Sequence, residues 1–286
     1  MENVGPWTQR WVVICGGTSG LGLGLVIAAA QQRANLIIVG RDPTRLENAK
    51  AMALENGAIS ATTYSIDLAM KNSDASASSQ SREETQLRLW LEVNEVDLLL
   101  NAIGRSDRGP LEQLTDRELV SMLNDNVLCT WNMTRMALAS LKRARGTIVN
   151  IGSLAGLVAT PGMGGYSVSK TALTAMSRQL RVELAKVGVH VMLVCPGPIA
   201  RQDSGTRYEK LVEQRGLADG ASTAPGGGVK LKALDPKILC RKILDAAHRR
   251  KYELVTPVKA SLLAGISNLW PRLSDWILKK YMRKQS

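Results

Sequence analysis

Short apolar segments rich in Val, Ile and Leu recur along the chain, and stretches with helical spacing of apolar residues lie between them. This alternation is typical of a parallel β-sheet covered by helices, because strands buried on both faces read as continuous apolar runs. The predicted strands are residues 12–15, 35–39, 59–66, 96–101, 146–151, 189–194 and 253–256. The pattern predicts an α/β fold, a Rossmann-like doubly wound parallel sheet with helices on both faces.

No break in composition divides the 286 residues, so we predict a single domain over residues 1–286. Two stretches interrupt the pattern. Residues 71–85 are rich in Ser and charge and are predicted to form a surface insertion. Residues 201–232 contain three consecutive glycines and are predicted to form a mobile loop that acts as a substrate lid.

The chain carries 37 Lys and Arg against 25 Asp and Glu, which gives a net charge of +12. This excess admits phosphate-bearing ligands, anionic lipid surfaces or acidic carrier proteins as partners, and it also serves solubility alone. Nucleic acid is not an expected partner, because the sequence has neither a basic helix nor the aromatic-basic alternation of a known module.

Four cysteines are scattered over apolar elements without C-x-x-C spacing, which predicts reduced core thiols in a cytoplasmic protein. They are Cys15, Cys129, Cys195 and Cys240. His190 and His248 lack neighbours suited to metal binding, so no metal site is expected. The first residues lack the pattern of an export signal, and no apolar run reaches the ~18 residues of a membrane span.

Candidate chemistry is carried by Tyr166 and Lys170, which lie four residues apart in a predicted helix. One helical turn places both side chains on the same face. A neighbouring ammonium favours the phenolate and lowers the pKa of a phenol from its usual value near ~10, which makes Tyr166 a candidate general acid and base. This spacing also occurs by chance in helices, so its weight depends on the motifs around it.

A glycine turn follows the first predicted strand. Residues 16–22 read Gly-Gly-Thr-Ser-Gly-Leu-Gly and lead into an apolar helical stretch. Glycine gives the backbone freedom at such a turn and leaves room for a pyrophosphate at the helix N-terminus. The spacing G-x-x-x-G-x-G differs from the G-x-G-x-x-G of most dinucleotide folds, and a turn without a ligand is the alternative interpretation.

Further motifs are Ile-Asp-Leu at 66–68, Asn-Ala-Ile-Gly at 101–104, Asp-Asn-Val at 125–127, Ile-Gly-Ser at 151–153 and Pro-Gly-Pro-Ile at 196–199. In this order, the motifs resemble the short-chain dehydrogenase/reductase family, in its branch with a Tyr-x-x-x-Lys active site. The likeness runs from about residue 11 to residue 198, with family-like segments to about residue 257.

The resemblance implies two sets of functional residues. The catalytic positions fall on Asn126, Ser153, Tyr166 and Lys170. The cofactor-binding positions fall on Gly16, Thr18, Ser19, Gly20, Leu21, Gly22, Asp67, Leu68, Asn101, Gly104, Tyr166, Lys170, Pro196, Gly197 and Ile199. Two departures weaken the match locally: Ala102 and Ile103 change the Asn-Asn-Ala-Gly motif, and Arg201 stands where the family often has Thr. A side-chain bond from position 201 to the carboxamide is therefore in doubt, although the backbone of Ile199 could serve.

Roles follow from the same resemblance. Tyr166 would deliver a proton to the alkoxide that develops when a hydride reaches a carbonyl carbon, and Ser153 would hydrogen-bond that oxygen. Lys170 would hold the ribose of the nicotinamide, and Asn126 would bend its helix and hold a water that links Lys170 to solvent. Taken singly, three of these residues also fit a structural role. Ser153 could be a cap, Asn126 an internal polar residue of a helix, and Lys170 a solvated charge.

The end of the second strand indicates which cofactor is used. An acid there would accept bonds from the ribose hydroxyls and repel a 2′-phosphate, but the sequence has Gly40 and then Arg41, whose guanidinium suits a phosphate. Asp42 before Pro43 is interpreted as a helix N-cap. We therefore predict NADP, with Arg41 among its ligands.

The sequence thus predicts an NADP-dependent oxidoreductase that interconverts a ketone and a secondary alcohol. The alternative is a catalytically weak nucleotide-sensing or interaction protein on the same fold. Family members often associate through two helices, here about residues 116–142 and 166–187, and Leu173, Leu180 and Leu184 are among their apolar residues. A homodimer or homotetramer is expected.

Residues 259–286 carry apolar residues at helical spacings and end in a basic cluster. Such a segment can lie in a membrane interface with its Trp rings at the headgroups. It can equally cover the substrate pocket or a subunit interface. The first interpretation predicts a location peripheral to the inner face of a membrane and a lipophilic substrate, of 3-ketoacyl, 3-ketosphinganine-like or steroid-like type.

Overall fold

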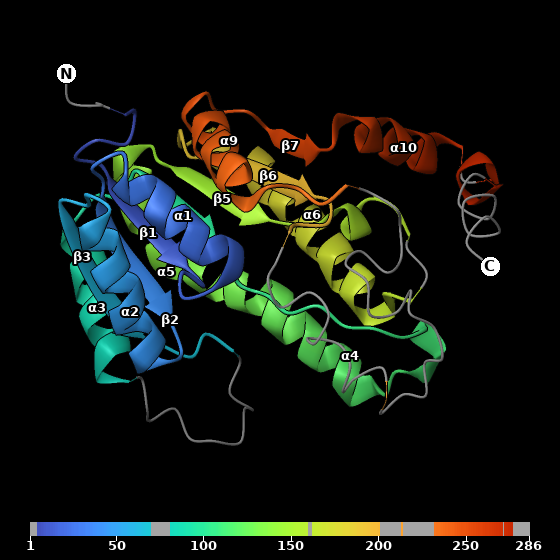
Figure 1. Cartoon of the computed structure of the whole chain (residues 1–286), viewed down its shortest axis with the longest axis horizontal. Coiled ribbons are helices and arrows are strands. Elements are labelled where there is room, and N and C mark those ends of the chain that lie inside the picture. The colour runs from blue at the N-terminus through green and yellow to red at the C-terminus, as the bar shows by residue number, and fades with distance from the viewer. Residues whose placement is uncertain are drawn as a thin grey trace.

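Seven parallel strands form one sheet in the order β3-β2-β1-β4-β5-β6-β7 (Figure 1). The computed structural model describes residues 5–69, 81–159, 162–200, 213, 232–270 and 272–276. The strands are β1 (Trp11–Cys15), β2 (Asn35–Gly40), β3 (Ser60–Ser65), β4 (Leu98–Asn101), β5 (Thr147–Ile151), β6 (His190–Pro196) and β7 (Glu253–Thr256). The predicted sheet is confirmed, and all predicted strand ends lie within two residues of the observed ones.

Helices cover both faces of this sheet, as the alternation of apolar segments predicted. The helices among the described residues are α1 (Gly20–Ala30), α2 (Pro43–Glu55), α3 (Arg82–Val93), α4 (Asp116–Leu123), α5 (Cys129–Ala144), α6 (Gly164–Ala185), α9 (Pro236–His248) and α10 (Val258–Leu269), of which α10 extends away from the sheet. Three short segments are the 3₁₀ turns η1 (Leu111–Gln113) and η3 (Leu154–Gly156) and the π-helical η2 (Asn124–Leu128). The fold is a single Rossmann-like α/β domain.

Alternation along β1 shows why both faces are apolar. Val12 and Ile14 pack into the core formed with α1, α2 and α9, whereas Val13 and Cys15 pack into the core formed with α3, α5 and α6. Both cores consist mainly of buried aliphatic side chains, and all four cysteines are buried free thiols. The predicted core thiols are therefore confirmed as unpaired and buried.

Two boundaries differ from the sequence prediction for local reasons. Residues 82–85, assigned to a surface insertion, form the first turn of α3, where Ser81 Oγ accepts a hydrogen bond from the amide of Glu84 at 3.1 Å. The single helix expected over 116–142 is instead α4, the π segment η2 and α5. Asp42 caps α2 with Pro43 in its first turn, as predicted.

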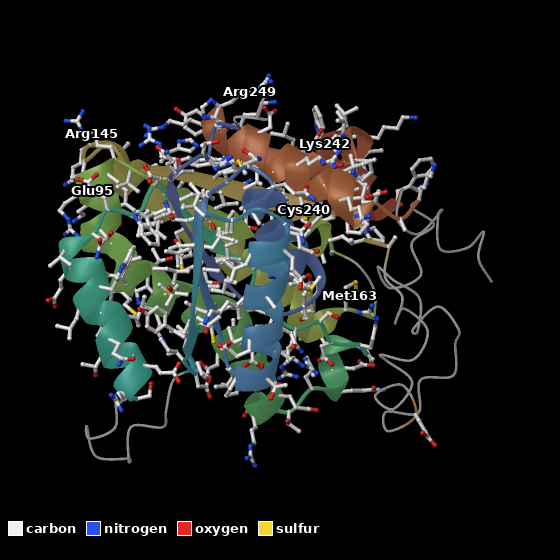
Figure 2. All side chains as sticks on the ribbon, turned by 60° about the vertical axis from the view of Figure 1, so that its left-hand side comes forward. Glu95, Arg145, Met163, Cys240, Lys242 and Arg249 are labelled. Carbon is white, nitrogen blue, oxygen red and sulfur yellow. The ribbon has the colours of Figure 1, made fainter. Side chains whose placement is uncertain are left out.

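The sheet order reverses between β1 and β4, which are neighbours although two other strands separate them in sequence. In such sheets the crevice at the carboxyl ends of the strands, at this reversal, is the usual ligand site. The turns after β1 and β4 both lie there. Figure 2 shows Met163, directly before α6, far from Glu95 and Arg145, which precede β4 and β5 at the opposite edge.

Segments far apart in sequence close the domain. The indole N–H of Trp7 donates to the carbonyl of Leu244 in α9 at 3.1 Å. The Trp7 and His248 rings pack edge to face, with their centroids 6.1 Å apart. Both Trp7 and Leu244 are buried. The N-terminal segment is thereby fixed on a helix formed by the last quarter of the chain.

Candidate active site

Tyr166 and Lys170 lie in the first two turns of α6, and the Lys170 amine is 5.8 Å from the centroid of the Tyr166 ring. Lys170 Nζ donates a hydrogen bond of 2.8 Å to the carbonyl of Ile151, the last residue of β5. The lysine side chain is only 4% exposed. The structure therefore ties the amine to the carboxyl edge of the sheet, beside the phenol.

Burial lowers the pKa of Lys170 to about 8 from 10.5, because the charged form loses its hydration. The nearby Cys195 thiol acts in the opposite direction, and burial in turn raises the pKa of that thiol to about 12. The amine still carries its proton at pH 7. It is thus a cation held in a poorly hydrated site, where its field on a neighbouring group is weakly screened.

Asn126 lies in the middle of η2, the one π-helical segment among the described residues. Its side chain is fully buried, and its Nδ2 donates to Ser169 Oγ at 2.8 Å and to the Arg105 carbonyl at 3.0 Å. Its Oδ1 accepts from the Arg105 amide at 2.9 Å. The side chain therefore serves to join three segments, and the expected local distortion of the helix is present.

Gly104, after β4, lies between Asn126 and Lys170. A Cβ at this position would come 2.4 Å from Asn126 Oδ1 and 3.3 Å from Lys170 Nζ, and its φ of +148° is one that only glycine adopts readily. The glycine of the Asn-Ala-Ile-Gly stretch is thus required by the packing of two candidate catalytic residues.

Ser153 begins the 3₁₀ turn after β5, where its Oγ accepts from the amide of Ala155 at 3.1 Å. A hydroxyl is donor as well as acceptor, so this bond leaves its proton able to reach another oxygen. The turn packs closely on α6, because a Cβ on Gly156 would lie 2.6 Å from the Lys170 carbonyl. Ser153 is consequently placed on the same edge as Lys170.

The glycine turn after β1 packs closely on itself and on the turn after β4. Gly16 has a φ of +81°, and a Cβ on Gly22 would lie 2.0 Å from the Gly16 carbonyl oxygen. Thr18 and Ser19 follow, and Ser19 precedes α1 without capping it through its side chain. No acidic residue lies in the first turn of α1, so Leu21 and its neighbours present a positive helix end. These features fit a dinucleotide pyrophosphate.

Other predicted cofactor residues lie at the carboxyl ends of their strands. Arg41 and Asp67 follow β2 and β3, and both are exposed. Asp67 Oδ1 accepts from the Ala69 amide at 3.1 Å, and the carbonyl of buried Leu68 accepts from Asn132 Nδ2 at 2.9 Å. The strand ends thus place a guanidinium and a carboxylate on the side of the crevice away from Lys170.

Asn101, at the end of β4, points into the core. Its Nδ2 donates to Thr134 Oγ1 at 3.1 Å and to Asn150 Oδ1 at 2.9 Å, and Asn150 continues the chain to Ser177 Oγ at 3.0 Å. Within the described residues, the buried Oδ1 of Asn101 has no hydrogen-bond partner. Its observed role is to connect neighbouring strands and two helices.

The turn after β6 lies beside the last strand. The Gly197 amide donates to the carbonyl of Thr256 at 2.7 Å, and Ile199 pairs with Leu234 in an isolated bridge. Pro196 is buried at the end of β6. Arg201 and nearly all of the predicted lid, residues 201–232, lie outside the described residues.

Sequence reasoning missed three residues at this edge. Asp107 and Arg108 are buried after β4, with the Arg108 amide donating to Asp107 Oδ1 at 2.8 Å. Asp107 Oδ2 lies 3.6 Å from the position a Cβ on Gly165 would take, directly before Tyr166. Ser169 bonds Asn126, as described above. Two charged residues in a loop carry no sequence signal of burial, and the Tyr-x-x-x-Lys motif does not specify the residue at position 169.

Among the described residues, no three His, Cys, Asp or Glu side chains gather as a metal site. His190 Nε2 lies 3.0 Å from the carbonyl of Lys251, and burial lowers the pKa of His190.

A family model described as "short chain dehydrogenase" matches residues 10–210. The ketoacyl reductase HetN of Nostoc sp. is 28% identical over 280 residues, covering 95% of this chain and 89% of the relative. The 2-(S)-hydroxypropyl-CoM dehydrogenase 3 of Xanthobacter autotrophicus is 31% identical over 195 residues, covering 68% of this chain and 73% of the relative.

Solved structures share the fold. A short chain dehydrogenase from Burkholderia cenocepacia, in complex with NADP, superposes with a TM-score of 0.71 at 21% identity and covers 95% of this chain and 98% of its own. The chain belongs to the short-chain dehydrogenase/reductase family, and it is an oxidoreductase of the NAD(P)-dependent type.

Proposed function

We propose that this chain is an NADP-dependent oxidoreductase that interconverts a ketone and a secondary alcohol, with Tyr166 as its acid and base. The observation that carries the proposal is the buried Lys170 amine, anchored 2.8 Å from the Ile151 carbonyl and 5.8 Å from the Tyr166 ring. A cation so placed favours the phenolate, and the phenol can then give and regain a proton near neutral pH.

The bound nicotinamide would supply or accept the hydride. In carbonyl reduction, Tyr166 Oη donates its proton to the substrate oxygen as negative charge develops there, and the Ser153 hydroxyl donates a hydrogen bond to the same oxygen. Lys170 orients the ribose through its ammonium. Asn126 acts through position, since its side chain is fully bonded to Arg105 and Ser169.

NADP is the proposed cofactor because no acid follows β2 directly. Arg41 takes the place next to Gly40, and Asp42 is engaged as the cap of α2 at 3.1 Å from the Arg45 amide. A guanidinium at this strand end suits a 2′-phosphate. The similar structure from Burkholderia cenocepacia was solved with NADP, which supports the same choice.

For the substrate we propose a lipophilic carbonyl compound, since one relative is named a ketoacyl reductase. A panel of ketones assayed with NADPH, from short polar to long-chain 3-keto compounds, would rank the candidates. Better turnover of short polar ketones would contradict this part of the proposal.

The decisive experiment compares the unmodified chain with Tyr166→Phe. We expect the variant to lose carbonyl reduction at least about a hundredfold, because the proton donor is gone, while NADPH binding measured by fluorescence stays nearly unchanged. Equal turnover by the variant and the unmodified chain would show that Tyr166 is not the acid and base. Tight NADPH binding with no turnover of any ketone by the unmodified chain would favour the alternative, a nucleotide-sensing protein.

A further inference from the structure

We propose that α10 and the turn after it form a docking surface for an anionic lipid membrane. The surface consists of six residues, Val258, Leu262, Leu269, Trp270, Leu273 and Trp276, and is called the α10 surface below. The exposure and charge of this surface indicate a lipid partner independently of the reaction proposed above.

One side of α10 is apolar and exposed along its whole length. Val258, Leu262 and Leu269 are 76%, 71% and 70% exposed. Their spacing places them on one side of the helix, and Gly265, between them, faces open space. The opposite side contains the buried Ala264. A helix on the surface of a globular protein normally exposes polar residues to solvent, whereas α10 exposes apolar ones.

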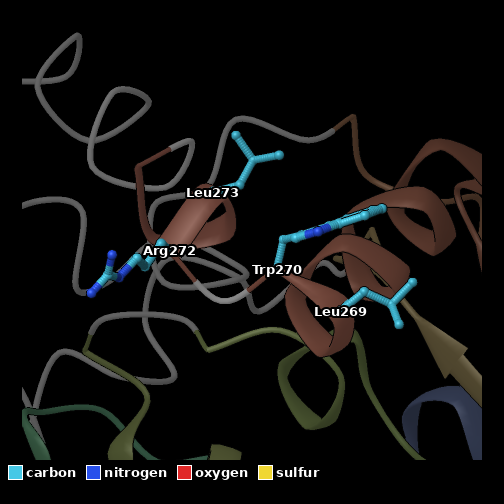
Figure 3. A pocket seen from close by; sticks show the side chains of 4 residues that line it. All are labelled: Leu269, Trp270, Arg272 and Leu273. Carbon is cyan, nitrogen blue, oxygen red and sulfur yellow. The ribbon is translucent and has the colours of Figure 1, made fainter.

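The apolar side continues past the end of the helix. Trp270 and Trp276 are 60% and 58% exposed, and Leu273 is also exposed. The turn that carries them is fixed on α10, because Ser267 Oγ and the buried Ser274 Oγ lie 2.5 Å apart. A hollow of about 450 Å³ is lined here by Leu269, Trp270, Leu273 and the charged Arg272. Figure 3 shows these four side chains at the end of α10 and in the turn after it.

Charge indicates what covers this surface. Residues 258–286 contain six Lys and Arg and one Asp, and exposed Lys259 and Arg272 flank the apolar side chains. A second copy of the chain would bring the same positive charge, and residues 201–232, with six cations and four acids, would not complement it either. Indole rings, aliphatic side chains and cations together fit the interface of an anionic bilayer.

The position of α10 gives such docking a use. The helix begins two residues after Thr256, whose carbonyl accepts the hydrogen bond from the Gly197 amide in the turn after β6. Figure 1 shows α10 extending from the end of β7 away from the sheet. Within the described residues no helix is both long and apolar enough to cross a bilayer. Docking along α10 would hold the carboxyl edge of the sheet near the lipid surface, where lipophilic ketones dissolve.

Co-sedimentation of the whole chain with vesicles tests the proposal. We expect binding to vesicles that mix phosphatidylcholine with phosphatidylglycerol, weaker binding to phosphatidylcholine alone, and loss of binding as salt rises. Leu262→Glu should weaken vesicle affinity at least about tenfold, because it replaces an exposed apolar side chain that would enter the lipid by a charge that the anionic lipid repels. Trp270→Ser provides a second variant without added charge and should also weaken it.

Leu89→Glu is the matched control, since Leu89 on α3 is also exposed, at 58%, and lies outside the α10 surface. It should bind vesicles nearly as the unmodified chain does, and circular dichroism should show all variants folded. Equal binding by Leu262→Glu, Trp270→Ser and Leu89→Glu would overturn the proposal, as would no binding at low salt. A dimer in the absence of lipid that Leu262→Glu dissociates, without vesicle binding, would assign the surface to a second copy instead. Sedimentation needs no turnover, so failure of the proposed reaction would leave this result readable.

Discussion

Asn126 Nδ2 lies 2.8 Å from Ser169 Oγ, and Ser169 Oγ in turn donates to the carbonyl of Tyr166 at 2.8 Å. These two bonds connect the π-helical segment η2 to the turn of α6 that carries Tyr166 and Lys170. Ser169 contacts the candidate site through the backbone carbonyl of Tyr166 and the side chain of Asn126, and it has no predicted role in the reaction itself. It is therefore a positioning residue for the proposed acid and base.

Ser169→Ala removes the acceptor of a buried amide and should lower the free energy of unfolding by about 1–3 kcal/mol. The turnover number kcat should also fall, with the KM for NADPH little changed. Ser177→Ala is the control, because Ser177 makes the same pair of bonds, to Asn150 Nδ2 at 3.0 Å and to the Leu173 carbonyl at 2.7 Å. A similar loss of kcat in both variants would show that Ser169→Ala acts by general destabilisation, which would contradict a positioning role for Ser169.

Gly104→Ala should reduce activity strongly, since its Cβ would press on Asn126 Oδ1 at 2.4 Å and approach Lys170 Nζ at 3.3 Å. We expect kcat to fall at least about tenfold, because small shifts of positioned groups are costly in catalysis. Gly57→Ala is the control: its φ is +98°, but the nearest atom is 3.6 Å away. Similar kcat values for Gly104→Ala and Gly57→Ala in steady-state kinetics would contradict the steric argument.

Burial of Lys170 predicts a pH dependence of stability. Its pKa is about 8 in the folded chain and 10.5 as the ordinary value, so between these values the unfolded chain holds a proton that the folded chain does not. The free energy of unfolding without cofactor should therefore rise by about 3 kcal/mol across this window.

Urea unfolding of the unmodified chain and of Lys170→Met, measured from pH 7 to pH 11, tests this contribution. The buried thiols titrate in both proteins, and their raised pKa values act in the opposite direction. The difference between the two proteins therefore reports the lysine together with its coupling to Cys195. We expect Lys170→Met to lose the rise. Parallel curves for the two proteins would show that the amine is not desolvated.

Arg41→Ala should raise the KM for NADPH by about ten- to a hundredfold, as expected for one charged hydrogen bond, and should leave the KM for NADH nearly unchanged. Arg249→Ala removes another exposed arginine, at the opposite edge of the sheet, where its Nε lies 3.0 Å from Asp245 Oδ1, and should change neither value. A preference for NADH in the unmodified chain would refute the NADP proposal.

A homodimer is expected to form through the outer faces of α5 and α6. Leu173, Leu180 and Leu184 cannot serve, because they are buried in the chain itself, whereas Val182 on α6 is 73% exposed. Val182→Arg should convert a dimer mass into a monomer mass in light scattering at micromolar concentration. A monomer mass for the unmodified chain would exclude this assembly.

The sequence predicted the sheet because each strand is a run of residues that must be buried on both faces, as Val12 to Cys15 are. The glycine turn could also be predicted, because close packing there requires glycine: a Cβ on Gly22 would lie 2.0 Å from the Gly16 carbonyl oxygen. The family resemblance implied a bend at Asn126, whereas the apolar pattern alone predicted one helix over residues 116–142 and not the π-helical form of that bend. Burial of Asp107 was also missed, because Asp107 packs near Gly165 of α6, which is distant in sequence.

The hydrogen bond between Trp7 and Leu244 has a consequence for how the chain folds during synthesis. β1 lies inside the sheet between β2 and β4, so it cannot be completed until residue 101 has left the ribosome. The indole N–H of Trp7 gains its acceptor later still, because the Leu244 carbonyl lies 237 residues further along the chain. Every strand pairing is parallel and closes a long loop, which slows folding and leaves apolar edges exposed meanwhile. The nascent chain is thus expected to need chaperone protection until α9 emerges.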